Sequence, residues 1–423
     1  MLNIQYLREH PEAARAALAR RHTDIPLDEL LAADAQRRTL LQETEGLKAQ
    51  LNEASKRMGQ IKDKTSADFE RARGELRELG DRVKVLDAQV TSVEATSLEL
   101  SLTIPNLPHQ SVPEGEDEHG NVTLRTEGTP RTFDFTPQPH WDIAEKLDII
   151  DFQRGVKLSG SRFYVLKGAA AKLQRAIIAW MLDYHAANGY VEIYPPALVK
   201  GEVMTGAGQL PKFFDNLYRD AEEDLFLIPT AEVPLTNLYR DEILAAEKLP
   251  IYHVACTPCF RREKVSAGRD VRGIKRVHQF EKVEMYKFVD PATSYDELER
   301  MLAEAEQLCR LLDIPHRVLA LCTGDLGFAA TKTYDIEIWA PGSQEWLEVS
   351  SVSNTEDFQA RRANIRYRPE PSARPVHPHT LNGSGLALPR TMIAILENYQ
   401  EADGTVVVPE VLRGYLGGMA KIG

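Results

Sequence analysis

Two long stretches in the first hundred residues place apolar or small side chains at alternating steps of three and four positions. The first predicts a helix with a heptad seam at Leu30, Ala33, Arg37, Leu40, Thr44, Leu47, Leu51, Ala54, Met58 and Ile61. The second predicts a seam at Phe69, Ala72, Leu76, Leu79, Val83, Leu86, Val90, Val93, Ser97 and Leu100. Turn-forming residues at 62–68 separate the seams. We therefore expect an antiparallel helical hairpin, with helices about 50 Å long.

The chain beyond the hairpin follows a different pattern. Residues 104–122 are rich in Pro, Gly and acidic residues, which is typical of a linker. After it, β-rich runs at 283–289, 334–339 and 405–408 alternate irregularly with helical patterns. This irregularity favours an α+β domain with a mostly antiparallel sheet flanked by helices. We predict an N-terminal domain at 1–103, a linker at 104–122 and a second domain at 123–423.

Charge and cysteine content indicate which ligands the chain is suited to bind. The 423 residues carry a net charge of −12, which does not indicate a general nucleic-acid binder, and we expect no DNA partner. The segment 48–77 is locally basic, with eight Lys or Arg side chains against five acidic ones, as a phosphate-binding tip requires. Taken alone, this segment is better explained as an ordinary solvated coiled coil. Cys256 and Cys259 have metal-ligand spacing, but no second pair completes a four-ligand zinc site.

Targeting signals are not evident in the sequence. No run of about 18 apolar residues could cross a membrane. The first residues lack the apolar segment of a secretion signal, and acidic residues interrupt the pattern of a transit peptide. We therefore expect a cytoplasmic protein without a membrane partner.

The segment 260–285 carries the main candidate chemistry. It predicts two antiparallel strands joined by a basic, glycine-containing loop at 264–273. Because alternate residues of a strand share a face, Arg261 and Glu263 should lie together. The same rule places three side chains of the second strand on one face: Phe280, Lys282 and Glu284. These residue types suit a phosphate, an aromatic base and an amine or hydroxyl group, although charge density alone also fits a solvated surface hairpin.

This segment resembles motif 2 of the class II aminoacyl-tRNA synthetases, in the form of the seryl-tRNA synthetase family, where FRxE, a GRDxRG loop and HQFxKVE follow one another. Five further segments resemble that family: a helix at about 169–188 with the strand 191–196 as motif 1, 205–213, the TxE element 230–232, 348–351, and 381–390 as motif 3. The hairpin is similar to the family's tRNA-binding arm. Pro389 departs from the pattern, since Gly is more usual there. The resemblance covers essentially the whole chain.

The resemblance implies an ATP site. Its residues would be Arg261, Arg262, Glu263, Arg276, Val277, Phe280, Glu348, Val349, Ser350, Ser351 and Arg390. Arg261 and Arg390 would be catalytic, with Arg261 holding the α-phosphate together with the amino-acid carboxylate. Phe280 would stack on adenine, and Arg390 would cover its opposite side. Glu348 and Ser351 would bind Mg²⁺, which prefers oxygen ligands.

The resemblance also implies the substrates. L-Serine would be held by Thr230, Ala231, Glu232, Arg261, Glu284 and Ser384. The expected reaction is formation of seryl-adenylate, followed by transfer of serine to tRNA(Ser) and also to tRNA(Sec). A homodimer would form through residues 169–196. The alternatives are another class II synthetase, a carrier-protein ligase, which would lack the hairpin, and a non-enzymatic coiled-coil protein.

Overall fold

The computed structural model describes residues 1–264 and 272–423, and its contacts divide the chain into two units. The hairpin unit comprises Leu2–Ala16 and Thr23–Pro105, and the sheet unit comprises Met1, Ala17–His22 and Asn106–Gly423. The sequence pattern did not indicate that Ala17–His22 belongs with the sheet. In the described part of the chain, no helix is both long and apolar enough to span a membrane.

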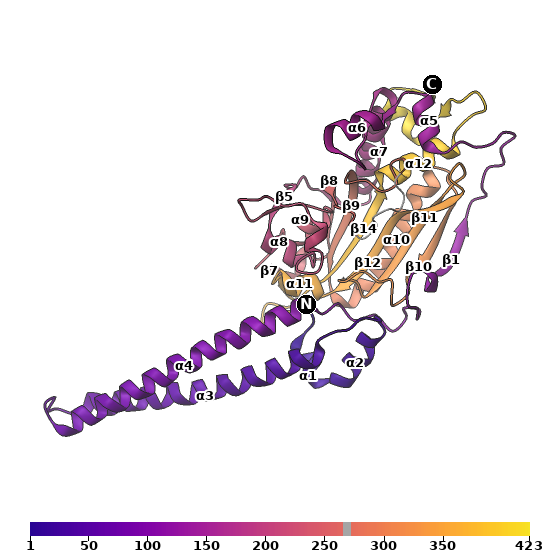
Figure 1. Cartoon of the computed structure of the whole chain (residues 1–423). Helices are drawn as coiled ribbons and strands as arrows, with labels where there is room; N and C mark the ends of the chain where they lie inside the picture. The colour runs from indigo at the N-terminus through magenta and orange to yellow at the C-terminus, as the bar shows by residue number, and fades with distance from the viewer. Residues whose placement is uncertain (265–271) are drawn as a thin grey trace. The chain divides into compact units, whose positions relative to one another are not determined.

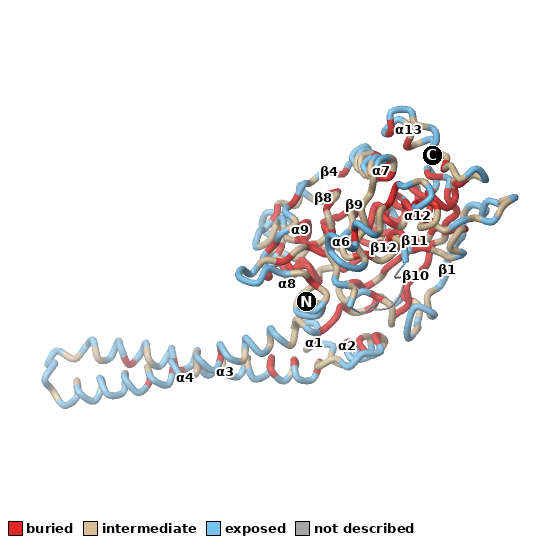
Figure 2. Tube along the Cα trace, turned by 45° about the horizontal axis from the view of Figure 1, so that its top comes forward, coloured by how far each residue is buried: buried red, intermediate tan, exposed pale blue. Residues whose placement is uncertain are grey.

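The hairpin unit confirms the predicted antiparallel helices (Figure 1). Its helices are α1 (Ile4–Glu9), most of α2 (Pro11–Ala19), α3 (Leu27–Gln60) and α4 (Ala67–Thr103). Ser66 begins α4, because its side chain accepts a hydrogen bond from the Phe69 N–H at 3.2 Å. Most residues of the hairpin are exposed or half-buried, and only a few along each helix are buried (Figure 2).

Most buried side chains of α3 and α4 lie in the predicted seams. They are Leu30, Ala33, Thr44, Leu47, Ala54, Leu79, Val83 and Val90. Asp34 is buried outside the seam, since Arg8, Arg37 and Arg38 surround its carboxylate at 3.1–3.5 Å. The seam position Arg37 is only half-buried and also lies 3.6 Å from Glu94. This end of the hairpin therefore combines apolar packing with an ion-pair cluster.

The sheet unit contains an eight-stranded sheet, antiparallel except for the pairing of β4 with β8. In spatial order the strands are β1 (Val122–Glu127), β10 (His316–Ala320), β11 (Lys332–Ala340), β12 (Glu345–Glu356), β14 (His379–Ala387), β9 (Gln279–Val289), β8 (Ile251–Phe260) and β4 (Val191–Glu192). The predicted α+β class with a mostly antiparallel sheet is confirmed. The expected strand 191–196 is shorter, because Pro195 and Pro196 have no N–H for a ladder.

Helices cover both faces of this sheet (Figure 1). The helices of the unit are α5 (His140–Lys146), α6 (Phe152–Ser159), α7 (Gly168–Ala187), α8 (Gly201–Gly206), α9 (Glu232–Thr236), α10 (Ser294–Leu311), α11 (Phe358–Arg362), α12 (Leu388–Asn398) and α13 (Glu410–Arg413). Helices α7, α10 and α12 pack with Val283 and Met285 in one apolar core. Helices α9 and α11 pack with Tyr286 and Phe288 in another. Successive residues of β9 thus face opposite layers.

Four short strand pairs complete the unit. They are β2 (Ile150–Asp151) with β3 (Val165–Leu166), β5 (Leu198–Lys200) with β6 (Leu225–Leu227), β7 (Ile243–Ala245) with β13 (Arg366–Arg368), and β15 (Val406–Val407) with β16 (Lys421–Ile422). The predicted strand at 405–408 corresponds to β15.

Candidate active site

Strands β8 and β9 form the antiparallel pair expected at 260–285, with Cys259 opposite Phe280. Phe280, Lys282 and Glu284 line one cavity of about 330 Å³, as their alternation predicts. The expectation that Arg261 and Glu263 lie on the strand is wrong, because β8 ends at Phe260 and Glu263 has a φ of +49°. Both side chains nevertheless line the cavity. The expected loop 264–273 lies mostly outside the described residues.

A second cavity of about 450 Å³ adjoins the first. The two share Glu232, Arg261, Glu263, Arg276, Lys282 and Asn382. The candidate residues that line only the first are Val277, Phe280, Glu284, Glu348, Val349, Ser351, Ser384 and Arg390. Thr230 lines the second cavity, and Glu232, which begins α9, reaches both. Most of the candidate residues are thus brought together from the 230–232 turn, the segments that follow β8 and precede β9, the strands β9, β12 and β14, and the start of α12.

Three candidate residues do not line these cavities. Ala231 is fully buried in the core beside Tyr286. The Arg262 guanidinium lies 5.9 Å from the Tyr218 ring centroid. Ser350 is buried and donates its hydroxyl to the Ser384 carbonyl at 2.6 Å, so it supports a neighbour of the cavity.

Near Thr230, the walls of the cavities carry the carboxylates of Glu232 and Glu284 and the ammonium group of Lys282. The Thr230 hydroxyl donates to Glu284 at 3.1 Å, and Glu284 forms an ion pair with buried Lys282. Glu232 accepts hydrogen bonds from Gln359 at 2.6 Å and Asn382 at 3.3 Å. Burial, reinforced by the charge of Glu284, raises the pKa of Glu232 to about 7. This arrangement suits a small ligand that carries an ammonium and a hydroxyl group.

Arginines dominate the opposite part of the first cavity. The Arg261 guanidinium lies 5.2 Å from the Phe280 ring centroid and donates to the Pro229 carbonyl at 3.3 Å. Arg390 contacts Glu348 at 3.2 Å and donates to its carbonyl at 2.6 Å. Burial opposes ionisation of Glu348, but Arg390 and then Arg261 outweigh it and lower the pKa of this carboxyl. Positive charge next to an aromatic face suits a nucleotide phosphate and base.

Motif 3 places Arg390 at the start of α12. Pro389 occupies the first turn of that helix, where the missing N–H removes no intrahelical hydrogen bond. The departure from the usual Gly is therefore compatible with the local structure. The irregular pairing of β14 with β9 between Ser384 and Ala387 orients the strand just before this helix.

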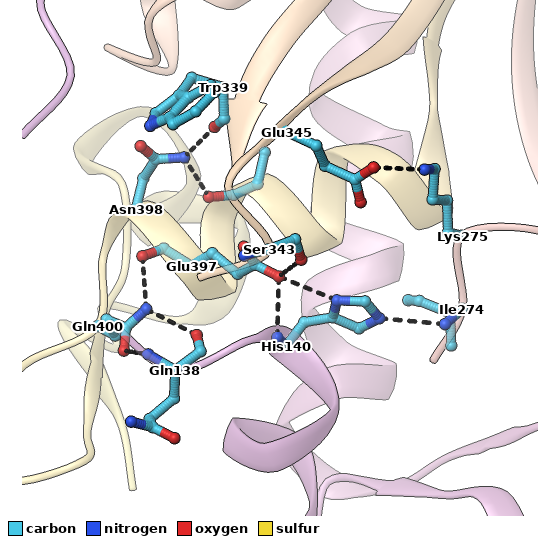
Figure 3. A network of polar contacts seen from close by, with 11 residues as sticks. Gln138, His140, Ile274, Lys275, Trp339, Ser343, Glu345, Glu397, Asn398 and Gln400 are labelled. Carbon is cyan, nitrogen blue, oxygen red and sulfur yellow. Dashed lines mark hydrogen bonds and ion pairs between the residues drawn. The ribbon is translucent and has the colours of Figure 1, made fainter. Parts of the chain in front are cut away.

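A polar network beside the first cavity holds the residues that follow 265–271 (Figure 3). Glu397 on α12 accepts hydrogen bonds from the His140 N–H at 2.9 Å and from the Ser343 hydroxyl at 2.7 Å. The His140 ring in turn accepts from the Ile274 N–H at 3.2 Å, and Lys275 pairs with Glu345 at 2.6 Å. These contacts fix the backbone immediately before Arg276 and Val277, both of which line the first cavity.

The sequence did not indicate every polar group of the site. Lys275 and Asn382 line the cavities, and Gln359 anchors Glu232 from α11. Lys282 was expected on the correct face but was given no role. Asp335 lies opposite Ser351 in the ladder between β11 and β12. Burial, with the charge of Glu348, raises the pKa of Asp335 well above its usual value. Only the strand register places Asp335 here.

Similar proteins define the class of this fold and site. Residues 214–399 match the tRNA synthetase class II core domain (G, H, P, S and T), and residues 1–108 match the seryl-tRNA synthetase N-terminal domain. The antiparallel sheet and its cavities are therefore those of a class II aminoacyl-tRNA synthetase.

Full-length relatives narrow the family. A serine–tRNA ligase of Roseiflexus sp. (strain RS-1) is 63% identical over 423 residues, covering 100% of this chain and 99% of the relative. The solved seryl-tRNA synthetase of Pyrococcus horikoshii, complexed with ATP, has a TM-score of 0.94 at 38% identity, covering 100% and 99% of the two chains. The Naegleria fowleri cytoplasmic enzyme, in complex with AMP, has a TM-score of 0.88 at 31% identity, covering 100% and 98%. The chain belongs to the seryl-tRNA synthetase family.

Proposed function

We propose that this chain forms seryl-adenylate in the two adjoining cavities and then transfers serine to tRNA(Ser). The overall activity, serine–tRNA ligation, follows from family membership. The observation that carries the site assignment is the convergence of Arg261, Phe280 and Arg390 with the carboxylates Glu232 and Glu284 around one cavity. That combination fits ATP at one end and the ammonium and hydroxyl groups of serine at the other.

The chemistry requires positioning and charge neutralisation more than a protein nucleophile. The serine carboxylate attacks the α-phosphorus of ATP, and pyrophosphate leaves. Arg261, shared by both cavities, is suited to hold the carboxylate and the α-phosphate together. Phe280 would stack on adenine, with Arg390 on its other side.

Serine would be held by the groups that surround the paired Lys282 and Glu284. Thr230 and Glu232 would bind its ammonium, and Glu284 and Ser384 its hydroxyl. A pocket built to hydrogen-bond a hydroxyl group rejects alanine strongly, because its own polar groups would be left without partners.

The residues present also fit a Mg²⁺ ion. Glu348, Ser351 and Asp335 offer oxygen ligands, and Asp335 Oδ1 has no hydrogen-bond partner within the described residues. Glu348 and Ser351 would hold the ion, and the charge of the bound cation would favour the ionised form of Asp335 behind Ser351. When bound, Mg²⁺ neutralises phosphate charge.

Amino-acid-dependent ATP–pyrophosphate exchange tests the proposed function. We expect exchange with serine and not with alanine, proline, threonine or histidine. Ser384→Ala should raise the KM for serine while leaving the KM for ATP close to its original value. Exchange driven by another amino acid in preference to serine would contradict the assignment. As a translation enzyme, the protein would act in the cytoplasm, and charging of tRNA(Sec) transcripts can be measured in parallel.

We also propose a homodimer, built on the C-terminal part of the predicted segment 169–196 and not on its helix. The apolar stripe of α7, including Leu173, Ile177 and Trp180, is buried in the core of its own chain. Two exposed apolar side chains lie just beyond α7, where Tyr194 is 94% exposed and Val191 is 58% exposed. Such an exposed group suits an interface between two copies.

Sedimentation tests the dimer. Tyr194→Glu should shift the protein from dimer to monomer at micromolar concentration while leaving its circular dichroism unchanged. Val85→Glu, at an apolar position on α4 that is as exposed as Val191, should leave the dimer intact. A monomeric unmodified protein would contradict the proposal.

A further inference from the structure

The loop between β10 and β11 forms one wall of the second cavity, through residues Gly327–Ala330. Each of the five consecutive carbonyls from residue 326 to residue 330 accepts a hydrogen bond from Arg21 or Asn106, and the Gly327 carbonyl also accepts one from the Ala330 N–H at 3.1 Å within the loop. Arg21 donates to the carbonyls of Leu326 at 2.9 Å, Gly327 at 3.0 Å and Ala330 at 2.5 Å. The Asn106 backbone N–H donates to Phe328 and its side chain to Ala329, each at 2.9 Å.

The two residues are also tied to each other and to the sheet. Arg21 is 6% exposed and donates to the Asn106 carbonyl through Nε at 3.0 Å and Nη2 at 2.7 Å. The Asn106 side chain also donates to the carbonyl of Thr355, which belongs to β12 and lines the same cavity. Burial lowers the pKa of Arg21 only to about 10, so the guanidinium stays charged at neutral pH. Its rigid fork of donors fixes several carbonyls at once.

Arg21 and Asn106 lie next to the points where the chain enters and leaves the longer segment of the hairpin unit. This segment runs from Thr23 to Pro105, so Arg21 and Asn106 lie just outside its two ends. Neither residue lines either of the two adjoining cavities. The loop they hold carries Phe328, whose ring lies 6.5 Å from that of Phe213, another residue of the cavity wall.

We propose that Arg21 and Asn106 are positioning residues for the amino-acid side of the active site. They hold the Leu326–Ala330 loop as the wall of the cavity that contains Thr230 and Glu232. This inference rests on the proposed assignment of those two residues to serine. Phe280 and Arg390, assigned to ATP, line the first cavity alone and do not share this wall. Loss of the hydrogen bonds from Arg21 and Asn106 to this loop should therefore raise the KM for serine more than the KM for ATP.

Pyrophosphate exchange with the full-length protein tests the inference. Arg21→Met should raise the KM for serine about tenfold, since several hydrogen bonds to a charged donor are lost. The KM for ATP should change by less than about twofold, because the loop does not touch the first cavity. Arg21→Lys should rescue part of the loss, because an ammonium can still bind some of the carbonyls. Asn106→Ala should raise the KM for serine by a smaller factor.

Two controls separate the possible outcomes. Arg131→Met removes another arginine that donates to backbone carbonyls, those of Asn398 and Gln400, away from both cavities, and should leave both KM values unchanged. Thr230→Ala tests the serine assignment itself, and an unchanged KM for serine there would refute that assignment. If Thr230→Ala raises the KM for serine while the folded Arg21 and Asn106 variants do not, Arg21 and Asn106 have no positioning role. An equal rise for serine and ATP would also overturn the inference. If Arg21→Met fails to fold, Arg21→Lys and Asn106→Ala decide.

Discussion

The hairpin α3–α4 carries most of its charges on the surface, whereas the sheet unit buries several of the charged side chains around its cavities. Ion pairs of the hairpin, such as Lys48–Asp87 and Arg57–Glu75, leave both partners about half exposed. Lys282 and Glu284 in the sheet unit are 8% and 1% exposed. Exposed pairs contribute about 0.2–1 kcal/mol and are screened by salt, so their side chains can exchange partners for phosphates. Breaking a buried pair costs about 3–5 kcal/mol, so its members stay oriented before a substrate arrives.

Replacing residues 30–100 by a short Gly/Ser linker tests whether the two regions act independently. The replacement retains Arg21, Asn106 and both cavities, so serine-dependent pyrophosphate exchange should persist. Charging of tRNA(Ser) should fall by about 10³-fold or more, because the phosphate contacts of the hairpin would be lost. Full charging by the shortened protein would show that the hairpin is only a structural rod. Loss of exchange in a folded protein would contradict independence.

Arg261→Ala tests the role of the charged side chains around the cavities of the sheet unit. Removing a preorganised charge from the site should lower the rate of pyrophosphate exchange by about 10²–10³-fold with the fold intact. Arg262→Ala is the matched comparison, since that side chain lies over Tyr218 outside both cavities, and its loss should be at least tenfold smaller. Near-normal exchange in a folded Arg261 variant would refute the proposed role.

The sequence predicted local periodicity and motif positions better than side-chain packing. The two seams and the face shared by Phe280, Lys282 and Glu284 follow from fixed repeats of 3.5 and 2 residues. The sequence did not show that the apolar stripe of α7, within the segment 169–196 predicted as the interface, is buried in its own chain. An apolar helix face looks the same in a sequence whether it packs against its own sheet or against a second chain. Asp335 and Gln359 were missed for a related reason, since strand register and helix docking bring them to the site from distant segments.

Removing positive charges at the tip of the hairpin tests whether its exposed side chains bind tRNA phosphates. Lys56, Lys62 and Lys64 are exposed and form no ion pair within the described part of the chain. Changing all three to Gln should weaken tRNA binding about 10²-fold at 0.1 M salt and flatten its dependence on salt by about two units of slope. Arg71 and Arg73 already contact Asp68 and Glu70, so the matched double change to Gln should have a smaller effect. Equal effects would show that existing ion pairs do not limit phosphate contact.

Glu232 gives the smallest expected effect and the most specific one. Its carboxyl is raised to a pKa of about 7 by burial and by Glu284, with Lys282 only partly opposing the shift. Only the ionised carboxylate can pair with the ammonium of serine, so the KM for serine should fall about tenfold between pH 6 and pH 8, while the KM for ATP should not follow.

Glu232→Gln should raise the KM for serine at pH 8 and remove this pH dependence. The same variant should affect stability with a defined sign. A carboxyl whose folded pKa exceeds its unfolded value destabilises the fold once the pH rises above the unfolded value. The melting temperature of the serine-free Gln variant should therefore exceed that of the original protein by more at pH 8 than at pH 5. A KM for serine that stays constant from pH 6 to pH 8 in the original protein would show that Glu232 does not bind the ammonium group as an ionising carboxylate.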